Sequence, residues 1–168
     1  AAPVDDVAAR VVTHIRRLRP QVVVTFDPIG GYMHPDHIAI QRATTRAFQL
    51  AGDSNFSDPA DLPPYQPQKL YYHIMPKGAF RLAVKIMPLL GRDPRKFGRN
   101  QDIDIVELVE KGNFPTHAVI DYRPVREKRD AAAACHASQL DGGSPRSGFL
   151  GFLFRLMGGK EQFMRASP

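Results

Sequence analysis

The chain has 168 residues, 43% of them hydrophobic and 24% charged, which is typical of a globular protein with its own core. This composition excludes a disordered, collagen-like or coiled-coil chain. The formal net charge of +6 favours anions, but alone it is a weak sign of nucleic-acid binding. The single cysteine, Cys135, excludes an internal disulfide and agrees with a reducing, cytoplasmic location.

The first third of the chain predicts a helix, a strand and a second helix. Apolar residues three and four positions apart predict a helix over residues 4–18. The β-branched run at 21–26 predicts a strand covered on both faces, as in a parallel sheet. A glycine-bearing loop leads to a helix that begins near Pro35 and stops at Gly52. This order predicts an α/β fold, whose ligands bind beyond the carboxyl ends of the strands.

The middle of the chain contains two segments that we expect to be loops or inserts, residues 53–67 and 76–100. Residues 53–67 are rich in proline and aspartate, which is typical of a surface loop. Residues 69–75, between the two segments, have strand character. An apolar stripe from Phe80 to Met87 beside basic residues predicts an amphipathic helix. Such a helix either packs on the core or touches a lipid or polyanion surface.

The last third predicts two strands, at 101–109 and 116–122, and then a helix at 124–139. The hydrophobic segment 149–157 is shorter than the ~20 residues that a spanning helix needs. Three interpretations of it stay open: a lid, a membrane-surface element, or a subunit contact that would make the protein a homo-oligomer. We expect residues 1–168 to form a single α/β domain.

The candidate site residues gather in the sequence His34-Pro35-Asp36-His37. Two histidines three positions apart at a helix start lie on nearly the same face, close enough to act on one metal ion or one substrate atom. Asp36 between them can fix a tautomer or balance an imidazolium. A His-x-x-His pair alone is a weak motif, and a surface pair without function is the simpler interpretation. Its position after a buried strand and a glycine-bearing loop favours a functional site.

The stretch VVVTFDPIGGYMHPDH and the helix after it resemble the second signature of the LmbE-like, PIG-L-type zinc-dependent deacetylases. This family includes N-acetylglucosaminyl-phosphatidylinositol de-N-acetylases and deacetylases of the mycothiol and bacillithiol pathways. EKRDAAAACHASQ resembles the family's C-terminal helix, and GKEQFMR resembles its final Glu-x-Phe element. The similarity is clear over residues 10–50 and 116–140. It implies a Rossmann-like three-layer fold with a largely parallel sheet.

Carried over position by position, the resemblance makes His37 a zinc ligand and His34 the catalytic histidine, with Asp36 as its orienting partner. Tyr32 matches a tyrosine that helps to polarise the acetyl carbonyl. The residues implied to bind substrate are Lys128, His136 and Gln139. The implied reaction is Zn²⁺-assisted hydrolysis of the amide in an N-acetylated amino-sugar conjugate, in which zinc lowers the pKa of a bound water toward ~7.

One part of the family pattern is absent from this sequence. The resemblance places the other two zinc ligands and the general base in an Ala-His-Pro-Asp-Asp element after the first strand of the sheet. Asp5 and Asp6 do not replace it, because no strand precedes them and they open a helix. We therefore expect a C-terminal portion that lacks the first strand and is inactive alone. The remaining candidate ligands in the chain are Asp27, His73, His117, Asp121 and His136.

Two alternatives to a deacetylase stay open. A non-catalytic relative would bind a carbohydrate or a lipid headgroup without zinc. A nucleic-acid binder is suggested by basic clusters at 16–19, 92–99 and 123–129. These clusters lie in three separate segments and no recognition motif accompanies them, so we expect a small-molecule partner and no nucleic acid.

Overall fold

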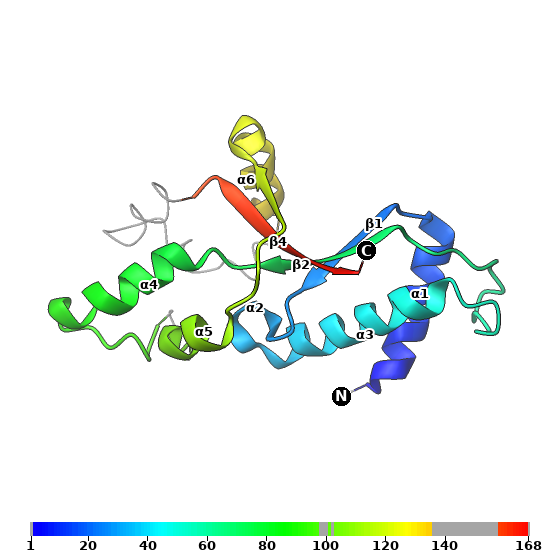
Figure 1. Ribbon diagram of the computed structural model, residues 1–168, viewed down its shortest axis with the longest axis horizontal. Helices are drawn as coiled ribbons and strands as arrows, with labels where there is room; N and C mark the ends of the chain where they lie inside the picture. Colours follow the sequence, from blue (N-terminus) through cyan, green and yellow to red (C-terminus); the bar gives the residue numbers. More distant parts are fainter. Residues whose placement is uncertain (1, 98–100, 102, 136–157, 168) are drawn as a thin grey trace. The chain divides into compact units, whose positions relative to one another are not determined.

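The computed structural model describes residues 2–97, 101, 103–135 and 158–167 (Figure 1). Within these ranges the helices are α1 (Val4–Leu18), α2 (Gly30–Met33), α3 (Pro35–Ala51), α4 (Lys77–Ile86), α5 (Ile105–Lys111) and α6 (Arg126–Ala134). Two short 3₁₀ helices are η1 (Pro88–Leu90) and η2 (Arg123–Val125). The strands are β1 (Val22–Phe26), β2 (Lys69–Ile74), β3 (Ala118–Asp121) and β4 (Lys160–Ser167), and they form one sheet in the order β1-β2-β4-β3.

The chain divides into two compact units. The first unit is Ala1–Ile74 with Phe114–Ala118 and Phe163–Pro168, and the second is Met75–Asn113 with Val119–Gln162. The sheet is mixed. β1 and β2 are parallel, whereas β3 and β4 are antiparallel, because the N–H of His117 donates to the carbonyl oxygen of Phe163 and the N–H of Tyr122 donates to that of Gly159. An α/β fold is therefore confirmed for the described residues.

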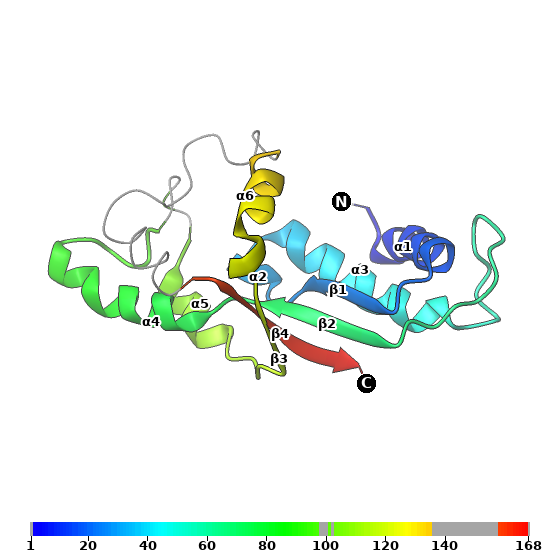
Figure 2. The same ribbon diagram turned by 90° about the horizontal axis from the view of Figure 1, so that it is seen from above.

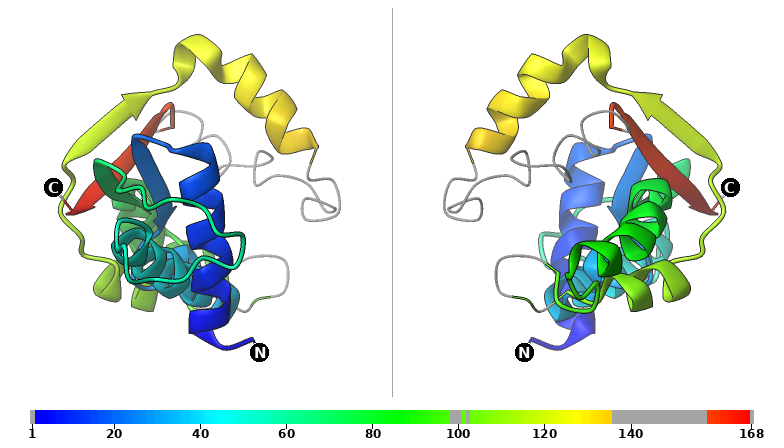
Figure 3. Two further views of the ribbon diagram at one scale, coloured as in Figure 1. Left: turned by 90° about the vertical axis from the view of Figure 1, so that its right-hand side faces the viewer. Right: turned by 90° about the vertical axis from the view of Figure 1, so that its left-hand side faces the viewer.

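The core of the first unit lies between α1 and α3, which pack against each other on one side of β1 (Figure 3). Small side chains let the two helices approach closely, because alanines make up most of their contact. The buried residues of this contact are Ala8, Val12, Ile15, Ala43, Ala47 and Ala51. The helices predicted over 4–18 and from Pro35 to Gly52 are thus confirmed, and their apolar stripes face each other.

The predicted strands at 21–26 and 69–75 are confirmed as β1 and β2, whose carboxyl ends point toward α2 (Figure 2). Their register pairs Phe26 with His73. One face of this strand pair packs against α3 through Leu70. On the other face Val22 and Val24 are 45% and 52% exposed. The expectation that this strand is covered on both faces is therefore wrong for the described residues, because none of them packs over these valines.

The second unit contains the amphipathic helix that the sequence predicts. It is α4, and its apolar stripe is buried at Phe80, Ala83 and Met87, whereas Arg81 and Lys85 are on the surface. Packing of this stripe inside the unit favours the first of the two interpretations, a helix that covers a core. Residues 53–67, in the first unit, form neither helix nor strand.

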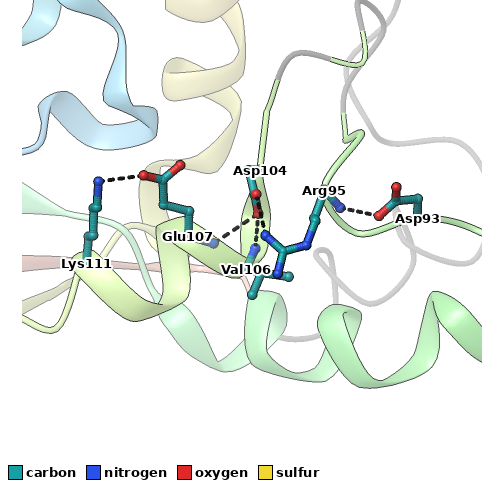
Figure 4. Close-up of polar contacts among 6 residues, drawn as sticks. All are labelled: Asp93, Arg95, Asp104, Val106, Glu107 and Lys111. Atoms are coloured by element: carbon teal, nitrogen blue, oxygen red, sulfur yellow. Dashed lines mark hydrogen bonds and ion pairs between the residues drawn. The ribbon is translucent and has the colours of Figure 1, made fainter.

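A strand predicted at 101–109 is wrong, because a helix, α5, begins at Ile105. The carboxylate of Asp104 accepts hydrogen bonds from the backbone N–H groups of Val106 and Glu107, at 2.9 and 3.0 Å (Figure 4). This cap starts a helix where alternating apolar residues also fit a strand.

The predicted strand at 116–122 is confirmed as β3, and the predicted helix at 124–139 is described from Arg126 to Ala134 as α6. Its remainder and the hydrophobic segment 149–157 lie outside the described residues. β4 is a strand that the sequence does not predict. No helix in the described part of the chain has the length and apolar character needed to cross a membrane.

Candidate functional site

The candidate site begins at the carboxyl end of β1, where Asp27 opens a tight turn. Asp27 is 2% exposed, and its Oδ1 accepts hydrogen bonds from the backbone N–H groups of Ile29 and Gly31, at 3.1 and 2.9 Å. Its carbonyl oxygen accepts from the N–H of Gly30 at 2.9 Å. An aspartate that accepts from the backbone two residues on is the signature of an Asx turn. The carboxylate thus holds the turn closed from inside.

The charge of Asp27 is poorly solvated. Burial raises the pKa of its carboxyl above the usual value, although the backbone N–H groups of Gly31 and Ile29 and the nearby His73 act to lower it. His73 lies beside it because the β1–β2 register pairs His73 with Phe26. The influence of His73 acts through its charge, whereas the turn amides are the groups that hydrogen-bond this carboxylate.

His37 lies in the first turn of α3 and is held from two sides. Its ring stacks on Phe26, with centroids 4.0 Å apart and planes 6° from parallel. Its Nδ1 lies 3.2 Å from the carbonyl oxygen of Gly30. A carbonyl oxygen can only accept, so this hydrogen bond requires the proton on Nδ1 and leaves Nε2 with its lone pair. Metal-binding histidines are commonly oriented in this way.

The hydrogen bond of His34 favours the opposite tautomer, with the proton on Nε2. It caps α3, and its Nδ1 accepts the backbone N–H of Asp36 at 3.2 Å. Because Nδ1 is the acceptor, a neutral His34 carries its proton on Nε2. The Asp36 carboxylate lies farther away, 3.9 Å from the same nitrogen, and is exposed. In this structure the backbone of Asp36, more than its carboxylate, orients the ring.

Tyr32, His34 and His37 form a cluster of three rings. The centroid of His37 lies 5.0 Å from each of the other two rings, and those two are 5.8 Å apart. Tyr32 is 40% exposed, so the cluster is open to solvent. The structure therefore brings together the tyrosine and both histidines that the sequence singled out.

The described residues alone do not complete a zinc site. No group of three or more His, Cys, Asp or Glu within the described ranges could hold a metal ion. The other candidate ligands in this part of the chain have different partners: Asp27 holds the turn, the ring of His73 lies 5.4 Å from that of Phe163, His117 Nδ1 accepts the N–H of Arg165, and Asp121 pairs with Arg123. Zinc needs three protein ligands in such sites, and these residues offer His37.

Of the residues implied to bind substrate, only Lys128 is described. It is exposed on α6, in the second unit. His136 and Gln139 lie outside the described residues. The structure thus shows the Tyr32, His34 and His37 cluster, and the predicted roles of these and of the substrate-binding residues stay predictions.

The sequence pattern predicts Asp27 only as a candidate metal ligand and predicts no role for the carbonyl group of Gly30. A signal for the turn was present, because Asp-Pro-x-Gly is a turn sequence in which the aspartate bonds the following backbone. The contact between Gly30 and His37 joins positions seven residues apart and has no counterpart in the pattern of residue types.

Comparisons with known proteins give related sequences and related folds. The sequence profile of the family described as PIG-L, GlcNAc-PI de-N-acetylase, matches residues 1–48, which reach from α1 into α3. The 1D-myo-inositol 2-acetamido-2-deoxy-alpha-D-glucopyranoside deacetylase of Geodermatophilus obscurus is 32% identical over 147 residues, 83% of this chain and 46% of the relative. Its namesake in Acidothermus cellulolyticus is 36% identical over 139 residues, 83% of this chain and 43% of the relative. The chain spans less than half the length of these curated relatives.

Two solved structures share the fold at low sequence identity. The conserved protein TT1542 from Thermus thermophilus aligns with a TM-score of 0.59 and 18% identity, over 97% of this chain and 59% of its own. GalB, the 4-carboxy-2-hydroxymuconate hydratase of Pseudomonas putida, aligns with a TM-score of 0.57 and 15% identity, over 100% and 60%. Likeness at such identities shows the fold alone, and a function has to be argued from the site.

Proposed function

Because the chain belongs to the PIG-L family of GlcNAc-PI de-N-acetylases, we propose that it forms part of a metal-dependent hydrolase that removes the acetyl group from an N-acetylglucosaminyl conjugate. The observation that carries this proposal is that the hydrogen bonds of two neighbouring histidine rings, His34 and His37, favour opposite tautomers. His37 offers a bare Nε2, which suits a metal ligand, and neutral His34 offers Nε2–H, which suits a hydrogen-bond donor at the reacting group.

The proposed roles follow the chemistry of amide hydrolysis. Water adds to the acetyl carbonyl carbon, the C–N bond breaks, and acetate and a free amine are the products. As the imidazolium, formed when its Nδ1 beside the Asp36 carboxylate takes up the proton that the attacking water releases, His34 would protonate the departing amine from Nε2. General acid catalysis of this kind contributes about 10²- to 10⁴-fold. Tyr32, exposed beside it, would donate a hydrogen bond to the acetyl oxygen. His37 would be one of the ligands of Zn²⁺, which acts in such enzymes as a Lewis acid.

We infer further that the other zinc ligands lie on a strand that pairs with the free edge of β1, outside the described residues. One observation supports this inference: β1 is at one end of the described sheet. A parallel strand at that edge would end beside Asp27 and His37, because the carboxyl ends of parallel strands meet at one edge of a sheet. The complete fold would then be Rossmann-like, with the sheet covered on both faces.

The test compares histidine variants of the full-length gene product. His37→Ala should lose bound zinc and deacetylation together. His34→Ala should keep the metal and slow acetate release by about 10²- to 10⁴-fold. His14→Ala is the matched control, because His14 lies on α1, away from the three-ring cluster, and it should change neither quantity. Zinc by atomic spectroscopy and acetate release from an N-acetylglucosaminyl-inositol are the measurements.

Two outcomes would contradict the proposal. If His34→Ala lost zinc while His37→Ala kept it, the assigned roles would be reversed. If the unaltered protein bound the sugar conjugate without zinc and released no acetate, the protein would be a non-catalytic binding relative.

A further inference from the structure

We propose that Asp27 is a positioning residue that acts on His37 through a single peptide group, the one that joins Gly30 to Gly31. The Asp27 carboxylate fixes this peptide, and the peptide fixes which nitrogen of His37 carries the proton. The consequence for metal binding rests on the proposed function, whereas the effect on the ring does not.

The geometry of the peptide group carries the first step. The N–H of Gly31 and the C=O of Gly30 belong to one planar unit and point in opposite directions in its trans form. The N–H donates to Asp27 Oδ1 at 2.9 Å, and the carbonyl oxygen lies 3.2 Å from His37 Nδ1. Asp27 and His37 thus hold the two ends of the same peptide. A rotation that released the carboxylate would also turn the carbonyl oxygen away from the ring.

The burial of Asp27 makes this control strong. At 2% exposure the carboxylate has little contact with water, so its hydrogen bonds to the turn are not easily exchanged for solvent. A hydrogen bond from an N–H to a carboxylate is stronger than one to a neutral acceptor, and hydrogen bonds in a chain polarise one another. The same chain should make the carbonyl of Gly30 a better acceptor and the Nε2 of His37 a better ligand.

The backbone conformation of the turn allows the Gly30–Gly31 peptide to contact both Asp27 and His37. Gly30 and Gly31 both have φ of 69°, a conformation that favours glycine. A Cβ at Gly30 would approach the backbone nitrogen of Ile38 to 2.9 Å, so an alanine there must push the turn away from α3. Gly91, at the end of η1, has nearly the same φ, 68°, and no atom lies within 4 Å of a Cβ added there. Gly30 and Gly91 therefore form a matched pair with similar φ and unequal contact with neighbouring atoms.

The experiment reads the ring of His37 directly in the metal-free, ¹⁵N-labelled chain. Long-range ¹H–¹⁵N correlations, recorded where the imidazole is neutral, report which ring nitrogen carries the proton. We expect Nδ1–H for His37 in the unaltered chain. Asp27→Ala should shift His37 toward the Nε2–H form, and Asp27→Asn should restore Nδ1–H, because its amide oxygen can accept the same two N–H groups.

A second pair of variants guards against loss of the fold in Asp27→Ala. Gly30→Ala should shift His37 toward Nε2–H, and Gly91→Ala, which introduces a similar backbone strain away from the turn, should leave Nδ1–H in place. His34 serves as the internal reference and should stay in its Nε2–H form. Retention of Nδ1–H by His37 in folded Asp27→Ala, or equal shifts in the two glycine variants, would overturn the proposal.

A metal measurement separates this proposal from the proposed function. In the full-length gene product, Asp27→Ala should weaken zinc affinity by about 10- to 100-fold, the usual effect of removing support from a ligand, and Asp27→Asn should recover it. If the ring state responds to Asp27 but zinc affinity does not, the assignment of His37 as a ligand fails and the positioning role stands. If zinc binding requires His37 but the tautomer of the His37 ring does not change in Asp27→Ala, the positioning role fails.

Discussion

The residue with the most unusual surroundings outside the site is Arg16. It is 3% exposed, and its guanidinium donates to backbone carbonyl oxygens rather than to a carboxylate. The acceptors are the carbonyl oxygens of Leu50, Ala51, Asp53, Phe56 and Leu62. Two of these carbonyls belong to the last turn of α3, where the helix dipole is negative and favours a cation. Arg16 therefore ties α1 to the end of α3 and to the loop that follows it.

Replacing this arginine should destabilise the protein markedly. Arg16→Met preserves most of the apolar stem but removes all five of these hydrogen bonds, so we expect a loss of about 2 to 4 kcal/mol in the free energy of unfolding. Arg10→Met on the same helix is the control, since Arg10 is exposed, and should cost less than about 0.5 kcal/mol. Urea denaturation measures both values. Equal losses in the two variants would show that the hydrogen bonds of Arg16 contribute nothing specific.

At this scale the sequence predicts which residues meet but not their chemical state. The spacing of His34 and His37 at a helix start correctly predicts that their rings are neighbours. Their opposite protonation depends on a carbonyl oxygen and an N–H of the backbone, which no side-chain pattern shows. Arg16 likewise fits the rule for a cation near a helix end, and only the path of the following loop makes it buried.

Among the elements, those with one clear period are predictable and those with two are not. α1 and α3 each follow a single helical period and β1 is an unbroken β-branched run, and the sequence places them within one residue of their ends. Residues 103–108 fit both the strand period and the helix period. Ile103 and Ile105 alternate with polar residues as in a strand, whereas Ile105 and Leu108 lie on one helical face. The cap at Asp104 decides in favour of the helix, with Arg95 bound to the same carboxylate at 3.0 Å (Figure 4).

This cap can be tested at the level of α5. Asp104→Ala should lower the opening free energy of the α5 amides by about 1 kcal/mol, and Asp104→Asn should leave it nearly unchanged, because asparagine caps equally well. Native-state hydrogen exchange of residues 105–111 is the measurement. If the alanine and asparagine variants exchanged alike, the ion pair with Arg95 would matter more than the cap.

The same cap should fail in acid. The backbone N–H of Glu107, then that of Val106 and the Arg95 guanidinium, hold the pKa of Asp104 below its usual value of 3.8. A carboxyl whose pKa is lowered by folding stabilises the folded state above that usual value and loses this effect as the pH falls through its folded pKa. The protection of α5 should therefore weaken below about pH 3.8 in the unaltered chain, and this weakening should vanish in Asp104→Ala.

At the scale of the whole molecule, the chain carries a folded part of a longer family pattern. It spans less than half of its curated relatives and offers one ring suited to zinc among the described residues. The family resemblance correctly predicts the α/β fold, and the family match at residues 1–48 covers α1, β1 and most of α3. The division into two compact units could not be predicted, since it depends on how β3 and β4 pair across distant segments.

The isolated 168-residue chain should therefore bind zinc weakly. If His37 is the one zinc ligand among the described residues, as proposed, we expect well under one zinc ion per chain after dialysis and no acetate release. Metal analysis of the purified chain measures the first quantity and an acetate assay the second. Stoichiometric zinc would mean that the chain contains further ligands, in residues beyond the described ranges.

Among the described strands β1 pairs on one side only, with β2, and this also affects how the isolated chain associates in solution. A strand edge that faces water is a template for pairing with another chain, and natural edges are usually blunted by lysine or proline. β1 contains neither, and its sequence is VVVTF. The net charge of +6 keeps copies apart by repulsion, which salt screens over about 10 Å at 0.1 M. Concentrated, salty solutions thus favour edge-to-edge stacking of chains, and dilute, low-salt buffer preserves single molecules.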